Sequence, residues 1–152
     1  MHTMKNNLLS KRRKDPVAQE RLIDSELDKF KTAIPEAELP ALPREVRTML
    51  QCIHACLFDP ALKVFEVKRR CGVKNNNIST TFKRALGRGI REYIEDLRLQ
   101  AAERLLAHEG LDIFLIGSAI GYAYEESFTR AFRRRLGCSP SAYRKEINQK
   151  KC

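Results

Sequence analysis

Residues 111–144 carry the pattern of two short helices joined by a tight turn. Ile113, Ile116 and Ile120 recur at three- and four-residue steps, which places them on one face of a first helix. Gly121 can end that helix because glycine adopts positive φ values without steric cost. The chain then turns, and a second helix is predicted to follow.

The second helix of this stretch is predicted to have two different faces. One side carries apolar residues at four-residue steps: Phe128, Phe132 and Leu136. The opposite side carries polar and charged residues: Glu126, Thr129, Arg130 and Arg133. A polar, cationic helix after a glycine turn is how a helix-turn-helix presents a recognition helix to the major groove of DNA. The candidate DNA contacts of this unit are Glu125, Glu126, Thr129, Arg130, Arg133 and Arg134.

The acidic pair Glu125 and Glu126 stands at the start of this second helix, where DNA phosphates would repel it. Two explanations remain open. At least one of the carboxylates either caps the N–H groups of its own helix, which we favour, or accepts a hydrogen bond from cytosine N4.

The same stretch resembles the signature of the AraC/XylS family of transcription regulators. The residues that match in order and spacing are Ile116, Gly121, Tyr122, Phe128, Arg130, Phe132, Gly137, Ser139, Pro140, Tyr143 and Arg144. The resemblance extends back to about Arg44, and the chain departs from the family at Gly117, where alanine is usual, and at Glu126, where serine is frequent. It implies an all-α domain with two helix-turn-helix units, double-stranded DNA as a partner, and contact with RNA polymerase.

A second copy of the motif precedes the first in the chain, at about residues 60–87. A shift of 50 residues superposes Ile78 on Phe128, Phe82 on Phe132, Leu86-Gly87 on Leu136-Gly137, and Tyr93 on Tyr143. This internal duplication predicts a second recognition helix without reference to any family. Its outer face is predicted to carry Asn75, Asn76, Ser79, Thr80, Lys83 and Arg84. Asn75 either caps the start of the helix or binds adenine N6 and N7.

Residues 88–108 are predicted to form a connector helix between the two units, the second of which spans about 111–137. Its apolar stripe consists of Ile90, Tyr93, Ile94, Leu97, Ala101, Leu105 and Leu106. Twenty-odd residues span roughly 30 Å in a helix, and successive major-groove segments on one side of B-DNA lie about 34 Å apart. One chain can therefore place both recognition helices in adjacent segments. The acidic residues of the connector, predicted to face away from phosphate, are Glu92, Glu95, Asp96 and Glu103.

Residues 1–43 are predicted to contain a flexible basic arm, an amphipathic helix that begins at Pro16, and a Pro-rich linker. The arm contains four consecutive basic residues, and the helix carries an apolar stripe of Ile23, Leu27, Phe30 and Ile34. Either the helix packs on its own domain or it forms a homodimer through residues 16–34. The segment is too short for the effector-binding domain that regulators of the family commonly carry, so ligand sensing is not expected within this chain. The DNA-binding domain is predicted to span 44–148 and to begin with a helix over 44–58.

Charge and cysteine content limit the remaining function classes. The net charge of +10 favours a polyanionic partner, and basic blocks at 63–91 (+8) and 128–152 (+7) flank an acidic block at 92–127 (−6). No run of about 18 apolar residues or signal peptide occurs, so we expect a cytoplasmic protein without a membrane span. Five cysteines without framework spacing indicate reduced thiols.

Neither an enzyme activity nor a cofactor is expected from these residues. Cys52 and Cys56 lie one helical turn apart with His54 between them, but two further ligands at the spacing of a zinc site are missing. Buried thiols are the better explanation of these cysteines. The rival hypotheses are a non-specific architectural DNA binder and a DNA-repair protein that accepts an alkyl group on a cysteine.

Overall fold

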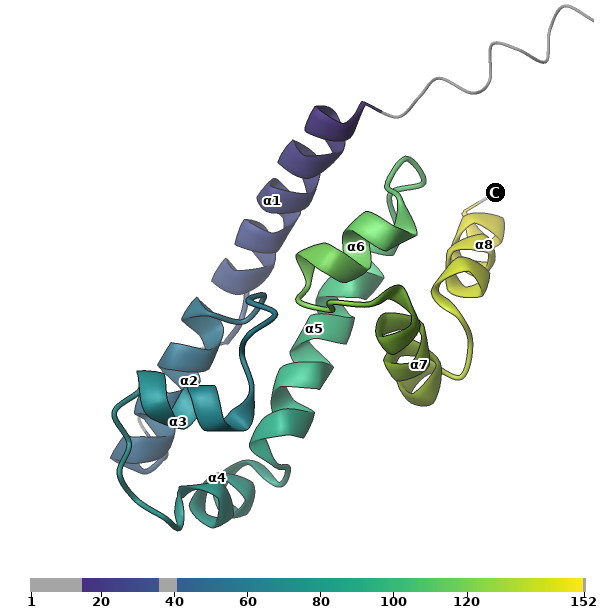
Figure 1. Ribbon diagram of the computed structural model, residues 1–152. Helices are drawn as coiled ribbons and strands as arrows, with labels where there is room; N and C mark the ends of the chain where they lie inside the picture. Colours follow the sequence, from purple (N-terminus) through teal and green to yellow (C-terminus); the bar gives the residue numbers. More distant parts are fainter. Residues whose placement is uncertain (1–14, 36–40, 152) are drawn as a thin grey trace, which may run out of the picture.

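The computed structural model describes residues 15–35 and 41–151, which fold into eight α-helices without a β-strand (Figure 1). This confirms the predicted all-α class. Most of the predicted basic arm and part of the Pro-rich linker, residues 36–40, lie outside the described residues. The helices are α1 (Pro16–Thr32), α2 (Arg44–Ala55), α3 (Val64–Arg70), α4 (Ile78–Leu86), α5 (Ile90–Leu106), α6 (Ile113–Ala119), α7 (Glu125–Leu136) and α8 (Pro140–Lys150).

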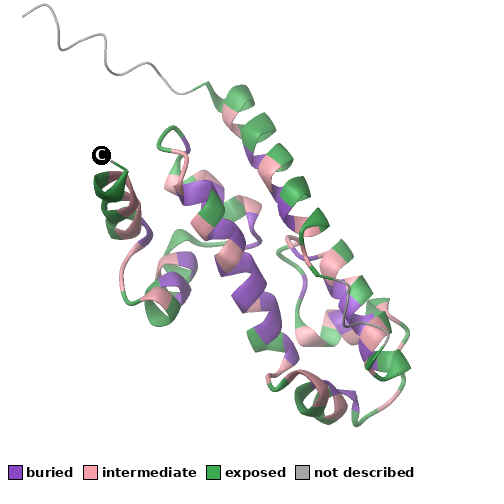
Figure 2. Ribbon diagram, turned by 180° about the vertical axis from the view of Figure 1, so that it is seen from behind, coloured by how far each residue is buried: buried purple, intermediate pink, exposed green. Residues whose placement is uncertain are grey.

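The connector α5 forms the centre of the fold and is buried on nearly every side (Figure 2). It contacts α1, α4, α6, α7 and α8. Every residue of its predicted apolar stripe is buried, but so are Leu99, Ala102 and two charged residues, Asp96 and Arg98. The expectation of one apolar face was therefore incomplete, because helices cover the connector from several directions. Its 17 residues give a length of about 25 Å rather than the predicted 30 Å.

The packing of aromatic rings confirms the internal duplication. In the first unit, Phe82 of α4 meets Tyr93 edge-on, with ring centroids 5.7 Å apart and an interplanar angle of 80°. In the second unit, Phe132 of α7 meets Tyr143 in the same way, at 5.4 Å and 78°. Both recognition helices end on a left-handed glycine, with φ values of 75° at Gly87 and 78° at its repeat equivalent. The two copies thus share their end signal and their anchoring contact.

The amphipathic helix α1 packs on its own domain. Ile23, Leu27 and Phe30 are buried against the common core, and α1 contacts α5. The guanidinium group of Arg104 lies 5.3 Å from the centre of the Phe30 ring. Of the two alternatives for this helix, the structure contains the intramolecular one, and burial of the stripe does not require a second chain.

Helix α2 begins at Arg44 as predicted and ends at Ala55, three residues before the predicted end. Its inward residues Val46, Leu50 and Ile53 are buried, and the helix contacts α3 and α4. Helices α2, α3 and α4 thus form the first unit on one end of α5, and α6, α7 and α8 form the second (Figure 1). None of the helices in the described ranges is long and apolar enough to cross a membrane.

Candidate nucleic-acid interface

The outer face of α7 presents the residues that were predicted for it on one surface. Phe128, Ala131 and Phe132 bury the inner side of the helix. The six predicted DNA contacts of this unit together line one shallow hollow: Glu125, Glu126, Thr129, Arg130, Arg133 and Arg134. Thr129 is half-buried and the other five are exposed. The face is therefore polar and accessible along the length of the helix.

The start of α7 differs from the favoured expectation. Its N-cap is Tyr124, which makes no side-chain capping hydrogen bond, and Glu125 and Glu126 are exposed in the first turn. The prediction that one of these carboxylates caps the helix by a hydrogen bond is wrong. The negative charges still interact favourably with the positive end of the helix dipole, and their oxygens stay open for a base contact.

Two of the four acidic residues of the connector, Glu95 and Asp96, pair with arginines. Glu95 accepts a hydrogen bond from Arg134 at 2.6 Å, so this carboxylate lies beside a predicted DNA contact. Asp96 forms ion pairs with Arg88 and with Arg135. Glu95 and Asp96 thus neutralise cations near the recognition helices, and the expectation that the acidic residues of the connector face away from phosphate stays a prediction.

The outer face of α4 is shorter than predicted. Ser79, Thr80, Lys83 and Arg84 are exposed and line a hollow beside the start of α5. Because α4 begins at Ile78, the two preceding candidates Asn75 and Asn76 lie in the turn before the helix, not on its outer face.

The side chain of Asn75 is occupied by contacts within the protein. Its Oδ1 accepts a hydrogen bond from the backbone N–H of Asn77 at 2.8 Å, and its Nδ2 donates to Glu45 at 2.9 Å. Of its two predicted roles, the structure contains one close to the capping role: the side chain fixes the turn that leads into α4. Asn76 is exposed at the same turn.

Arg98 joins the two units, and the sequence reasoning missed it. Its guanidinium group donates to the carbonyl oxygens of Leu57 at 2.8 Å and Asp59 at 2.7 Å, in the segment between α2 and α3. A longer contact of 3.4 Å reaches the carbonyl of Gly121, in the turn between α6 and α7. A Cβ atom at Gly121 would lie 2.8 Å from the guanidinium carbon. Burial lowers the pKa of Arg98, but a guanidinium keeps its charge in proteins. The only sequence signal was an arginine between Leu97 and Leu99.

Comparisons with known proteins identify this arrangement. A family model for a helix-turn-helix domain matches residues 67–146, more than half of the chain. A putative AraC-like transcription regulator of Streptomyces lividans is 32% identical over 102 residues, which cover 66% of this chain and 33% of the relative. The chain belongs to the AraC family of transcription regulators. It spans less than half the length of the curated AraC-family relatives it matches.

Solved structures share this fold. The C-terminal domain of AraT, a response regulator from Geobacillus stearothermophilus, is 28% identical, with a TM-score of 0.65 over 69% of this chain and 87% of that domain. The DNA-binding domain of the global transcriptional factor AdpA, solved in complex with a target DNA, shares the fold. It is 20% identical, with a TM-score of 0.61 over 68% of this chain and 95% of that domain.

Three cysteines of this AraC-family chain gather beside α2 and α3. Cys52, Cys56 and Cys71 are half-buried rather than fully buried. Burial, followed by a hydrogen bond with Cys52, raises the pKa of Cys71 to about 12, so this thiol keeps its proton at neutral pH and is a poor nucleophile. His54 shares a 2.8 Å hydrogen bond with the hydroxyl of Tyr93. Within the described ranges, no group of three or more His, Cys, Asp or Glu residues is placed to hold a metal ion.

Proposed function

We propose that this chain binds double-stranded DNA in a sequence-specific manner, with α4 and α7 in two adjacent segments of the major groove. One observation carries the proposal: two polar, accessible helix faces are held by one buried connector about 25 Å long. Helix α4 lies at the start of the connector and α7 packs beside it (Figure 1), so the two recognition helices are held apart on one rigid frame, as two successive major-groove segments about 34 Å apart require. A shared fold with a DNA-bound domain supports the same function.

The exposed side chains divide into those that hold the backbone and those that read bases. Arg130 lies in the middle of the outer face of α7 and can form a bidentate pair with guanine O6 and N7. Ser79 and Thr80 are short hydrogen-bonding groups at the start of α4, and Glu126 can accept from cytosine N4. The remaining exposed cations of both helices supply attraction to phosphates, which gives affinity without sequence information.

Selection of binding sites from random DNA tests the proposal. The expected result is a consensus of two short blocks with centres about one helical turn apart. Inserting about 5 base pairs between the blocks turns one of them to the opposite side of the duplex and should abolish the contribution of that block. If no consensus emerges, and a random competitor binds as tightly at the same salt concentration, the chain is an architectural DNA binder and the proposal fails.

The partners that regulation requires follow from the same proposal. We propose that the DNA-bound chain contacts RNA polymerase. We also propose that the chain acts in the cytoplasm, on DNA in the same compartment. Transcription in vitro from a promoter that carries the selected site, with and without the chain, measures this contact. A promoter whose output is unchanged at saturating occupancy contradicts it.

We further propose that one chain occupies the whole site as a monomer. The stripe of α1 is already covered by α5, and a homodimer through residues 16–34 would have to expose it again. Sedimentation of the full chain and of a shortened chain that starts at Arg44 tests this. We expect both the full and the shortened chain to sediment as monomers, and the shortened chain to have the lower melting temperature. A dimer formed only by the full chain contradicts the monomer proposal.

A further inference from the structure

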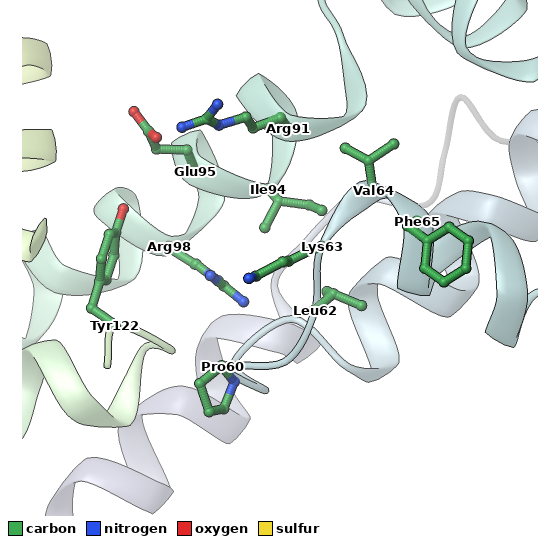
Figure 3. A pocket seen from close by; sticks show the side chains of 10 residues that line it. All are labelled: Pro60, Leu62, Lys63, Val64, Phe65, Arg91, Ile94, Glu95, Arg98 and Tyr122. Atoms are coloured by element: carbon green, nitrogen blue, oxygen red, sulfur yellow. The ribbon is translucent and has the colours of Figure 1, made fainter. Parts of the chain in front are cut away.

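A cleft lies between the two units, on the side of α5 that faces the start of α3. Its volume is about 480 Å³, and its walls come from residues 60–65, from α5 and from Tyr122. Figure 3 shows the side chains of Lys63, Arg98 and Tyr122 directed into the same space, with Arg91 and Glu95 on α5 at its edge. None of these residues belongs to a recognition helix, and no DNA contact has been assigned to the cleft.

The cleft joins the two outer faces into one continuous surface. Arg134 lines both the hollow on α7 and the neighbouring hollow between α5 and α7. Glu95 lines that second hollow and also the cleft. Val64 and Arg91 line the cleft and also the hollow on α4. The cleft therefore lies between the outer faces of the two recognition helices.

Some charged residues of the cleft have partners within the protein, and two cations do not form ion pairs in the described part of the chain. Glu95 is neutralised by Arg134, and Arg98 is buried on backbone carbonyls. Lys63 and Arg91 are exposed, and neither forms an ion pair with any residue in the described part of the chain. Two unmatched cations between the outer faces of the two recognition helices are suited to phosphate oxygens.

The Tyr122 hydroxyl adds a neutral donor to these cations. It comes from the turn that precedes α7 and projects toward the same space (Figure 3). Burial, followed by the charge of Glu95, raises the pKa of Tyr122 to about 12, so the hydroxyl keeps its proton at neutral pH. A protonated phenol can donate a hydrogen bond to a phosphate oxygen.

We propose that Lys63 and Arg91 bind the phosphates of the DNA segment between the two major-groove contacts. Between two successive major-groove segments on one face of B-DNA lies a minor groove, and the phosphates in question flank it. The cleft is then a third contact with the duplex, which adds affinity and fixes the distance of the connector from the DNA axis without reading bases. The inference rests on the proposed function.

The salt dependence of binding measures this contact directly. The full chain and its Lys63→Gln and Arg91→Gln variants are titrated with a selected two-block duplex between 50 and 200 mM salt. Loss of one phosphate contact lowers the salt slope by about 0.9, so the affinity loss across this range should be about 3.5-fold smaller for each variant. The selected consensus should stay the same, and the melting temperatures should stay unchanged because both side chains are exposed.

Arg21→Gln is the matched control because it removes the same charge from an exposed position on α1. Helix α1 lies apart from both recognition helices in both views (Figures 1 and 2). The salt slope of the Arg21→Gln variant should equal that of the unchanged chain. If the control lowers the slope as much as the two cleft variants, the effect comes from overall charge and the cleft contact is refuted.

Ethylation interference locates the phosphates concerned. We expect ethylation between the two blocks to weaken binding of the unchanged chain, and to have little further effect on the double variant. If the chain selects a two-block site but neither Lys63→Gln nor Arg91→Gln changes its salt slope, the cleft contact is refuted and the proposed function remains intact. A chain that selects no site refutes the proposed function, and the cleft contact with it.

Discussion

Arg98→Met tests whether the buried guanidinium holds the two units together. Methionine fills much of the same space with a flexible apolar side chain, but it donates no hydrogen bond. The change leaves the carbonyl oxygens of Leu57 and Asp59 without the donors that now lie 2.8 and 2.7 Å away. The third contact, at 3.4 Å from the Gly121 carbonyl, is long and contributes less.

The magnitude follows from these two short bonds. A hydrogen bond that involves a charged group contributes about 1.5–3 kcal/mol, so two of them give about 3–6 kcal/mol. Removing the buried charge also removes its desolvation cost, which offsets part of that loss. We therefore expect the free energy of unfolding to fall by about 2–4 kcal/mol in urea denaturation. Domains of this kind are stable by about 5–15 kcal/mol, so the variant should still fold at 25 °C.

DNA binding separates a joining role from a merely stabilising one. Two recognition helices at a fixed spacing bind a two-block site far better than one block, because the second contact is intramolecular. Arg98→Met should lower the ratio of the affinity for the two-block site to the affinity for a single block. Arg98→Lys keeps the charge and can reach one carbonyl, so it should lower this ratio less. A stability loss below about 1 kcal/mol would contradict the energetic estimate. A large stability loss with an unchanged ratio would refute the joining role.

Three further outcomes are expected. Gly117→Ala should lower the free energy of unfolding by about 1–3 kcal/mol, because a Cβ atom there would lie 2.8 Å from Cδ1 of Phe128; urea denaturation measures this. Hydrogen bonds from the two arginines at the end of α3 lower the pKa of Glu66 from 4.5 to about 2. Its stabilising effect should be present above about pH 4.5 and lost as the pH falls toward 2, so Glu66→Gln should flatten the melting temperature across that range. Arg130→Ala should relax base preference at one position by about 1–3 kcal/mol, while Arg134→Ala should weaken all sequences alike; repeated site selection distinguishes them.

Hydrophobic periodicity predicted the helices that have one covered side. The inner face of α7, the stripe of α1 and the repeat of α4 were all identified because apolar residues recur there at helical steps. The glycine that ends each recognition helix was equally clear, because both copies keep it at the same offset. These are local signals, and a single sequence contains them in full.

The same reasoning could not predict what the connector does with its charges. Asp96 and Arg98 are buried outside the predicted apolar stripe, and their partners Arg135 and Leu57 lie far away in sequence. The pair of Glu95 and Arg134 joins residues 39 positions apart. Periodicity shows which residues share a face of a helix, but it does not show how many other helices surround that helix. The position of Asn75 was missed for a related reason, because no local signal separates a turn before a helix from its first turn.

The relative placement of the two recognition helices depends on the polar contacts of α5 as well as on its apolar ones. Apolar burial is not directional, so it permits small rotations of one unit against the other at little cost. The Arg98 guanidinium bound to two carbonyl oxygens, and the Asp96 carboxylate between two arginines, have defined geometry and resist such rotations. These contacts also use charge that would otherwise face the DNA, since Glu95 offsets part of the charge of Arg134. The acidic residues of the connector that orient α7 therefore also reduce the attraction of α7 to phosphate. Arg133 forms no ion pair in the described residues, whereas Arg134 is paired with Glu95. The salt slope of DNA binding should therefore depend more on Arg133 than on Arg134.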